Sequence, residues 1–438
     1  LTPSCAPKRE VIVTLCLRHT GPYTDFMKTI LLLLLCSGAN AFTNPLSLRE
    51  AFRIALEKNE SPEISKLQAV QADERVSQAF GKLLPNLSLV GAYQRQDSPL
   101  DATGPLKSDQ STVKFSLTQP VFHGFSDIYA YESLKAKLRG QTANTFQTTL
   151  NLYVSVAKVF YDTLSIEHDV INLNHLLELS EKREKELKDR TQIGRSRKGE
   201  LLAALSQVAT VKVQVESAKF QLIQARDNFQ FITGVESKAE LEDEPHAVIP
   251  HTASLELYLN MVENRPDVTG QKEELASSDD LVLAAKGGHW PSLDLSGNYY
   301  LHRTGLLADS KWDVGVSLLI PIFKGFSTQG EIREAVAKRK ERELLLAQTR
   351  RAAVKDIRTA FYNLRSGIVQ YEALLVAVKT ANENHKQQLR EYGYGLVSNL
   401  DVIQASNTLT EARRNLDRNH YQTKLALVSL QAAAGQIP

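Results

Sequence analysis

The two halves of this chain resemble each other at a distance of about two hundred residues. Three pairs of segments share one offset of 201 residues: 124–126 with 325–327, 160–161 with 361–362, and Gly194 with Gly395. Upstream, residues 85–89 resemble residues 291–295, with the offset changed to 206. Solenoid repeats have periods of only about 20–50 residues, so a repeat of this length indicates a duplicated domain. The chain is therefore expected to fold as two similar halves, 42–250 and 251–438.

The first residues of the chain have the pattern of a leader. A basic residue after Met27 precedes the apolar run 30–35, and small residues follow it. This order is typical of a secretory signal peptide, here at 27–41, whereas a buried hydrophobic helix is the alternative. Residues 1–26 precede the expected start and are interpreted as untranslated or as an upstream extension.

All three cysteines, Cys5, Cys16 and Cys36, precede the expected cleavage point. The mature chain would then contain no thiol and need no oxidising compartment. Cys36 raises the alternative of lipidation, but Leu35 stands before it where lipidation motifs have a small residue. The chain has 52 Lys and Arg against 50 Asp and Glu, a balance that does not indicate a nucleic-acid partner.

Motifs of catalysis are not recognisable in the sequence. Gly393 and Gly395 lack the third glycine and the preceding strand of a dinucleotide site. His246 and His251 flank Pro250, an arrangement that favours a loop over a zinc site. We therefore expect neither an enzyme nor a resident metal or cofactor.

Long helices dominate the expected fold. Residues 126–193 and 327–394 are free of proline and rich in helix-forming side chains, and each stretch would span roughly 100 Å as one helix. Further helical stretches follow at 200–232 and 401–434. Val402, Leu409 and Leu416 recur every seven residues, which is typical of a coiled-coil seam.

Four short segments alternate apolar and polar residues, at about 85–95, 111–121, 291–301 and 311–322. Each has roughly the ten residues that a tilted transmembrane strand needs, although ordinary half-buried hairpins are the alternative. Four strands cannot close a barrel, and lipid does not tolerate an open sheet edge. If these strands enter a membrane, several copies of the chain must pool them.

Several short motifs in this order resemble the TolC family of outer-membrane efflux proteins, also called outer membrane factors. They are residues 46–51 and 55–59, 83–85, 119–124 and its copy 320–325, 264–268, and 392–395 followed by Ser398, 401–402 and Ala405. The resemblance covers nearly the whole mature chain. It implies a homotrimer whose twelve strands form one β-barrel in the outer membrane lipid, continuous with a periplasmic α-barrel of long coiled-coil helices.

The same resemblance implies an exit duct of a tripartite efflux or type I secretion system, working with a periplasmic adaptor protein and an inner-membrane pump. A secreted coiled-coil scaffold without a pore is the alternative. The clean alternation at 291–299 and 312–320 argues against it, since a scaffold needs no lipid-facing band. The cargo, whether drugs, metal ions or a secreted protein, cannot be inferred from these residues.

Two tips, at about 194–199 and 395–400, are expected to narrow the periplasmic entrance. In the family, acids just past the tip glycine line this entrance, and Asp401 and Glu200 occupy that place here. Capping of the following helix is the alternative role for both acids. The resemblance adds these candidates: Gln404 where a second acid is frequent, Tyr392 as a link from the second tip to the first-half acid, and Arg195 and Arg197 as substitutes for a missing arginine.

Two prolines are expected to mark the joints between strand and helix. Pro120 and Pro321 lie at the ends of the second and fourth expected strands, just before the long helices. Because proline donates no backbone hydrogen bond, we expect each to end the ladder of its strand and start a new chain direction.

Overall fold

A computed structural model describes residues 45–95, 97, 109–243, 254–304 and 307–437. The expected signal peptide, the extension at 1–26, Cys36 and the boundary between halves at 250 lie outside these residues, as do His246 and His251. The elements are α2 (Leu48–Lys58), α3 (Glu60–Gly81), β1 (Asn86–Arg95), β2 (Asp109–His123), α4 (Ser126–Gln192), α5 (Lys198–Thr233), α6 (Leu255–Leu259), a 3-10 turn (Val262–Asn264), α7 (Pro266–Gly287), β3 (Ser292–Arg303), β4 (Trp312–Leu319), α8 (Ser327–Gly393) and α9 (Asn399–Ala433).

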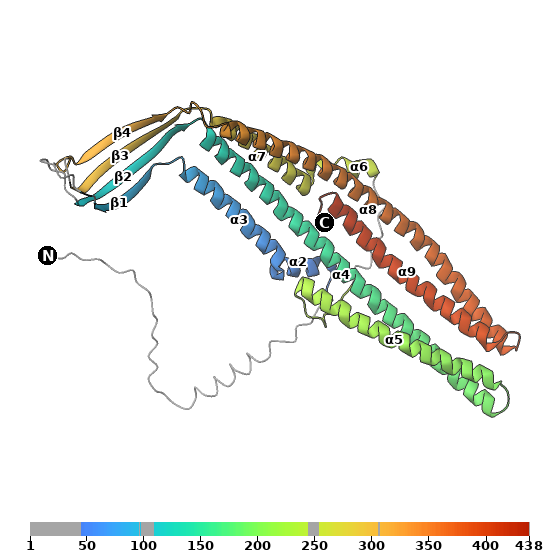
Figure 1. The fold of residues 1–438 in the computed structure, drawn as a ribbon. Helices are drawn as coiled ribbons and strands as arrows, with labels where there is room; N and C mark the ends of the chain where they lie inside the picture. Colours follow the sequence, from blue (N-terminus) through green and yellow to red (C-terminus); the bar gives the residue numbers. More distant parts are fainter. Residues whose placement is uncertain (1–44, 96, 98–108, 244–253, 305–306, 438) are drawn as a thin grey trace, which may run out of the picture. The chain divides into compact units, whose positions relative to one another are not determined.

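The duplication is visible element by element in Figure 1. The order α3, β1, β2, α4, α5 is repeated as α7, β3, β4, α8, α9. Helices α4 and α8 each have 67 residues, and helices α3 and α7 each have 22. The offset of 206 residues relates α3 to α7 and β1 to β3. The offset of 201 residues relates α4 to α8 and α5 to α9. The second half is therefore shorter in the segment that runs from its first strand to its long helix.

The main chain has the same unusual conformations in both halves. Positive φ angles occur at Gly124 and Gly325 and at Gly234 and Gly435, and each pair keeps the smaller repeat offset. Phe125 and Phe326 also have positive φ, 63° and 65°, which is uncommon for residues with a side chain. Each stands immediately before one of the two long helices, so the turn from strand into helix has the same geometry twice.

Each half has its own apolar core around a phenylalanine of its long helix. Phe160 is fully buried between α2, α4 and α5, with Phe229 and Tyr421 in the same cluster. Its counterpart Phe361 lies with Ile357 in a second cluster between α7, α8 and α9. Helix α9 contributes to both clusters and thereby joins the halves. Within the part of the chain that the structure describes, none of the helices combines the length and apolarity that a membrane crossing requires.

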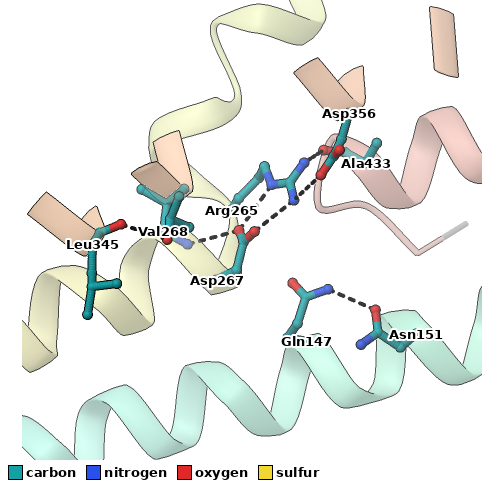
Figure 2. A network of polar contacts seen from close by, with 9 residues as sticks. Gln147, Asn151, Arg265, Asp267, Val268, Leu345, Asp356 and Ala433 are labelled. Atoms are coloured by element: carbon teal, nitrogen blue, oxygen red, sulfur yellow. Dashed lines mark hydrogen bonds and ion pairs between the residues drawn. The ribbon is translucent and has the colours of Figure 1, made fainter. Parts of the chain in front are cut away.

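An equivalent hydrogen bond closes each half onto the end of its last helix. In the first half, the Asn59 side chain donates to the Ile232 carbonyl over 2.9 Å. In the second half, Nη1 of the buried Arg265 donates to the Ala433 carbonyl over 2.9 Å (Figure 2). The Arg265 guanidinium also forms a bidentate pair with Asp267, so two residues of the motif at 264–268 are bonded to each other at the start of α7.

The four strands form one antiparallel sheet in the order β1-β2-β3-β4. Strand β2 does not end at Pro120, contrary to the expectation from the sequence, but continues to His123. The register of β2 against β3 shifts between Pro120 and Phe122. This shift accommodates Pro120, which has no backbone N–H to donate to the neighbouring strand. Pro321 lies two residues beyond the end of β4, between that strand and α8.

Candidate functional site: a two-faced sheet and two helix tips

The register of the sheet gathers most of the apolar side chains of the four strands on one face. This face consists of Leu87, Leu89, Gly91 and Tyr93, then Val113, Phe115 and Leu117, then Leu293, Leu295, Gly297 and Tyr299, and finally Trp312, Val314, Val316 and Leu318. Most of its side chains are exposed: Val316 is 69% exposed and Leu87 is 67% exposed. We call this set the apolar sheet face.

The opposite face carries most of the polar side chains, including Ser88, Lys114, Ser116, Thr118, Asp294, Ser296, Asn298, Asp313 and Ser317. A chain of hydrogen bonds crosses it. The Ser116 hydroxyl donates to Oδ1 of Asn298 over 2.9 Å, and Nδ2 of Asn298 donates to Oδ1 of Asp313 over 2.8 Å. The sheet therefore presents an apolar and a hydrogen-bonded polar surface on its two sides.

Aromatic residues lie at both ends of the apolar sheet face. Tyr299 pairs with Trp312 near the connecting loop of β3 and β4. At the helix end, Phe122 and Phe125 meet edge to face with ring centroids 5.0 Å apart, and Phe323 and Phe326 repeat this pair at 5.4 Å. Aromatic girdles at the two ends of an apolar band are typical of strands that cross a membrane.

The helical tips have equivalent turns at Gly194 and Gly395, with φ angles of 71° and 76°. The amide of Arg195 donates to the Arg190 carbonyl over 2.8 Å, and the amide of Leu396 donates to the Glu391 carbonyl over 3.0 Å. Both are helix-ending motifs that need a left-handed residue, for which glycine has no steric penalty. The two tips are therefore built by one local mechanism.

Asp401 lies at the start of α9 and closes a capping box with Ser398. Its Oδ2 accepts hydrogen bonds from the Ser398 amide over 2.8 Å and from the Ser398 hydroxyl over 2.6 Å. These bonds favour the charged carboxylate, so they hold the pKa of Asp401 below its ordinary value. The capping role considered from the sequence is therefore present, and the carboxylate is still exposed to solvent.

Glu200 occupies the corresponding position at the start of α5 with a different partner. Its Oε2 accepts a hydrogen bond from the Ser196 hydroxyl over 2.5 Å. Arg197 is the residue that precedes this helix, and both Arg195 and Arg197 are exposed. Gln404, one helical turn beyond Asp401, is exposed as well. The two acids thus share a backbone position but not their hydrogen bonding.

Tyr392 of the second tip lies against two arginines of the first half. The guanidinium carbon of Arg183 is 3.7 Å from the centre of the Tyr392 ring, and that of Arg190 is 5.4 Å away. Such stacking of a cation on an aromatic face is attractive. The link therefore runs from α8 to α4, while Glu200 bonds within its own tip.

Arg183 and Asn399 are tip residues that the sequence reasoning missed. Nε of Arg183 donates to Oδ1 of the buried Asn399 over 2.8 Å, which fixes the start of α9 against α4. Arg183 lies one heptad beyond the buried Leu176 of the same helix. Arg183 is therefore a charged residue at a seam position, and such a residue usually has a partner across the seam. This pattern could have indicated from the sequence that Arg183 makes a contact at the tip.

The bonds between Asp401 and Ser398 should make the first turn of α9 depend on pH. We expect faster amide hydrogen exchange in residues 400–403 of Asp401→Ala than in the wild type near pH 7. Because the folded-state pKa is lowered, this protection should be present above the ordinary Asp range and vanish as pH falls through the lowered value. Hydrogen exchange corrected for intrinsic rates tests this, with Glu200→Ala as the control that should leave α9 unchanged.

An exposed apolar sheet that continues into two very long helices, each of which turns back at a glycine, is typical of one class of protein, the strand-anchored channels of the outer membrane. A family model described as outer membrane efflux protein matches residues 54–235 and 257–436, once in each half. The chain therefore belongs to the outer membrane efflux protein family.

Individual proteins with the same features are similar over most of their length. Outer membrane protein TolC of Escherichia coli is 23% identical over 442 residues, covering 93% of this chain and 86% of TolC. The fold matches a membrane protein from Pseudomonas aeruginosa with a TM-score of 0.82, at 18% identity over 89% of this chain and 90% of that one. It also matches the Campylobacter jejuni CmeC outer membrane channel with a TM-score of 0.80, at 17% identity over 89% and 85%.

Family membership gives the general function and the place of the chain. It is an outer-membrane exit duct of the kind that serves efflux or type I secretion, and it extends from the outer membrane into the periplasm. This agrees with the mainly helical fold, the duplicated halves and the four-stranded sheet expected from the sequence.

Proposed function

We propose that three copies of this chain form one continuous duct, with a twelve-stranded barrel in the outer membrane and a tunnel of helices in the periplasm. The observation that carries the proposal is the sheet, which combines an uncovered apolar face with two edge strands, β1 and β4. Unpaired edges are not tolerated in lipid, so each edge must pair with a strand of another copy. Joining β4 of one copy to β1 of the next satisfies both edges.

The orientation of the barrel follows from the chemistry of the two faces. The apolar sheet face would contact lipid, and the polar face with its bonds between Ser116, Asn298 and Asp313 would line a water-filled lumen. Cargo would pass through this lumen without chemical change, so the duct is passive. A periplasmic adaptor protein and an inner-membrane pump would supply the cargo and the energy.

The helical tips would form the periplasmic entrance and set its resting closure. Gly194 and Gly395 make the turns, Tyr392 and Arg183 hold the second tip against the first half, and Asp401 remains exposed. Three Asp401 carboxylates converging on the axis would repel one another and favour a bridging divalent or trivalent cation. Gln404 offers no second charge one turn on, while Glu200, Arg195 and Arg197 would surround the first tip.

The assembly can be tested by fractionation and gel electrophoresis. We expect the protein to sediment with outer membranes and to migrate as a trimer that survives detergent without heating and dissociates on boiling. The mature chain should begin at Phe42. Recovery of a soluble periplasmic monomer would instead favour the scaffold without a pore.

A further inference from the structure

A histidine bridges two carboxylates at the joint between strand β2 and helix α4. Nδ1 of His123 lies 2.6 Å from Oδ2 of Asp127, and Nε2 of His123 lies 3.0 Å from Oδ1 of Asp294. Asp127 is in the first turn of α4, and Asp294 is on the polar face of β3. The last residue of β2 therefore connects the neighbouring strand to the long helix that follows (Figure 1). We call His123, Asp127 and Asp294 the joint triad.

The main chain of this joint is fixed independently of the triad. Gly124 and Phe125 both have positive φ, and a side chain at Gly124 would collide with the Gly287 carbonyl at the end of α7. The Phe125 ring also meets Phe122 edge to face. Because the turn is held by these main-chain and apolar contacts, it should remain folded when a polar contact of the triad is lost.

The geometry identifies the protonation state of the imidazole. An ionised carboxylate only accepts hydrogen bonds, so both ring nitrogens must donate if Asp127 and Asp294 are to be bonded at once. Both nitrogens carry a proton only in the charged imidazolium. The additional proton lies on the ring because histidine is a stronger base than aspartate. The triad with both bonds therefore exists only while His123 is charged.

The surroundings of the ring allow this charge to change. The charged groups that act on His123 are Asp127 from α4 and Asp294 from β3, and strand β4 contributes the uncharged Ser317 beside Asp294. The three triad side chains are 33%, 35% and 37% exposed, so water reaches them. Histidine changes its charge between about pH 5 and 8. As the pH rises and the ring loses a proton, one nitrogen can no longer donate and its bond is lost.

The corresponding joint of the second half carries different chemistry. The offset of 201 residues places Lys324 at the position of His123 and Thr328 at the position of Asp127. Lysine stays charged over the range in which histidine titrates, and threonine does not titrate there. A response to pH at the joint between strand and long helix is therefore expected in the first half and not in the second.

We propose that the joint triad is a pH-sensitive device, which fastens α4 to the sheet while His123 is protonated and releases one contact as the pH rises. The device lies within one copy of the chain, so it goes beyond the proposed function and does not depend on the assembly. Loss of the proton also adds one negative charge to the polar sheet face. In the proposed duct, this change would make the lumen more negative at higher pH.

Nuclear magnetic resonance of histidine tests the charge state in the full chain in lipid bilayers. The protein would carry isotope-labelled histidine, and the His123 signals would be assigned by their loss in His123→Lys. We expect both ring nitrogens to be protonated at about pH 6 and one of them to have lost its proton at about pH 9. A His123 ring that is neutral at the lower pH, or still charged at the higher one, would overturn the proposal.

Amide hydrogen exchange tests the effect on the joint. Residues 129–132 include the Tyr129 amide, which donates to the Phe125 carbonyl at the start of α4. After correction for intrinsic rates, we expect these amides to exchange about tenfold more slowly in the wild type at the lower pH than at the higher one, as for loss of one hydrogen bond to a charged group. His123→Lys keeps a positive charge and should exchange slowly at both values, and His123→Gln should exchange fast at both.

His302→Gln is the matched control, because His302 is on the same sheet but contacts the Ser111 hydroxyl, over 2.9 Å. It should keep the response of the wild type. An equal response to pH in the wild type and His123→Lys would contradict the proposal. Native mass measurement of the same samples reports the trimer separately, so monomers that keep the response would contradict the assembly and support the joint triad.

Discussion

Val316→Arg should destabilise the membrane-inserted protein by about 2–4 kcal/mol, whereas Ser317→Arg, one residue further along β4, should be tolerated. The two residues are neighbours in sequence but lie on opposite faces of the sheet. Val316 pairs with Leu295 on the apolar sheet face, and Ser317 pairs with Asp294 on the polar face. Lipid cannot solvate a guanidinium, but a water-filled lumen can.

The comparison of Val316→Arg with Ser317→Arg isolates the effect of the sheet face, because both variants add the same side chain to the same strand. Urea unfolding of protein folded into lipid bilayers gives the difference in free energy, and the amount of trimer in membranes gives a second readout. Leu295→Arg should behave as Val316→Arg does. Equal losses at positions 316 and 317 would show that the assignment of lipid and lumen faces is wrong.

Phe160→Ala should lower the free energy of unfolding by about 3–5 kcal/mol, the range for removing a buried aromatic ring. Phe160 is fully buried in α4, edge to face with Tyr161 and with the Phe229 ring centroid 6.3 Å away. The cluster around Phe160 holds α2, α5 and α9 against α4. The cavity left by the missing ring would therefore weaken both the first half and its contact with α9 of the second half.

Phe231→Ala provides the matched control, because Phe231 lies two residues from Phe229 on α5 but is 83% exposed. We expect a much smaller change there, within roughly 0.5 kcal/mol. Denaturant unfolding in detergent, followed by circular dichroism, measures both variants. A Phe160→Ala protein as stable as Phe231→Ala would mean that the cluster around Phe160 is not the core of the first half.

Much of the architecture follows from local patterns in the sequence. The absence of proline and the many helix-forming side chains predicted the two longest helices, and α4 and α8 lie within a residue of the expected bounds. The alternation that predicted the strands also assigns their faces, because the side chains of a strand alternate with a period of two. Pro120 shows the limit of this reasoning, since a bulge that admits proline depends on the neighbouring strand and not on β2 alone.

The tips were less predictable, because their contacts join residues that are distant in sequence. The position of Asp401 after Gly395 indicated both capping and entrance lining, and the hydrogen bonds to Ser398 show the first of these. No periodicity indicates that Tyr392 lies on Arg183, which is far away in the sequence and belongs to the other half. Tyr392 is on α8 and Arg183 is on α4, so only the tertiary packing of the helices brings these residues together.

Single-channel recording in planar bilayers tests the central claim, that this chain forms a duct with an Asp401 ring at its entrance. We expect the purified wild-type trimer to insert and give discrete conductance steps, and a trivalent cation on the tip side to block the current. Asp401→Ala should conduct and resist this block, because the bridging carboxylates are gone. Folded trimers that give no conductance would contradict the duct, and equal block of both proteins would place the ring away from the constriction.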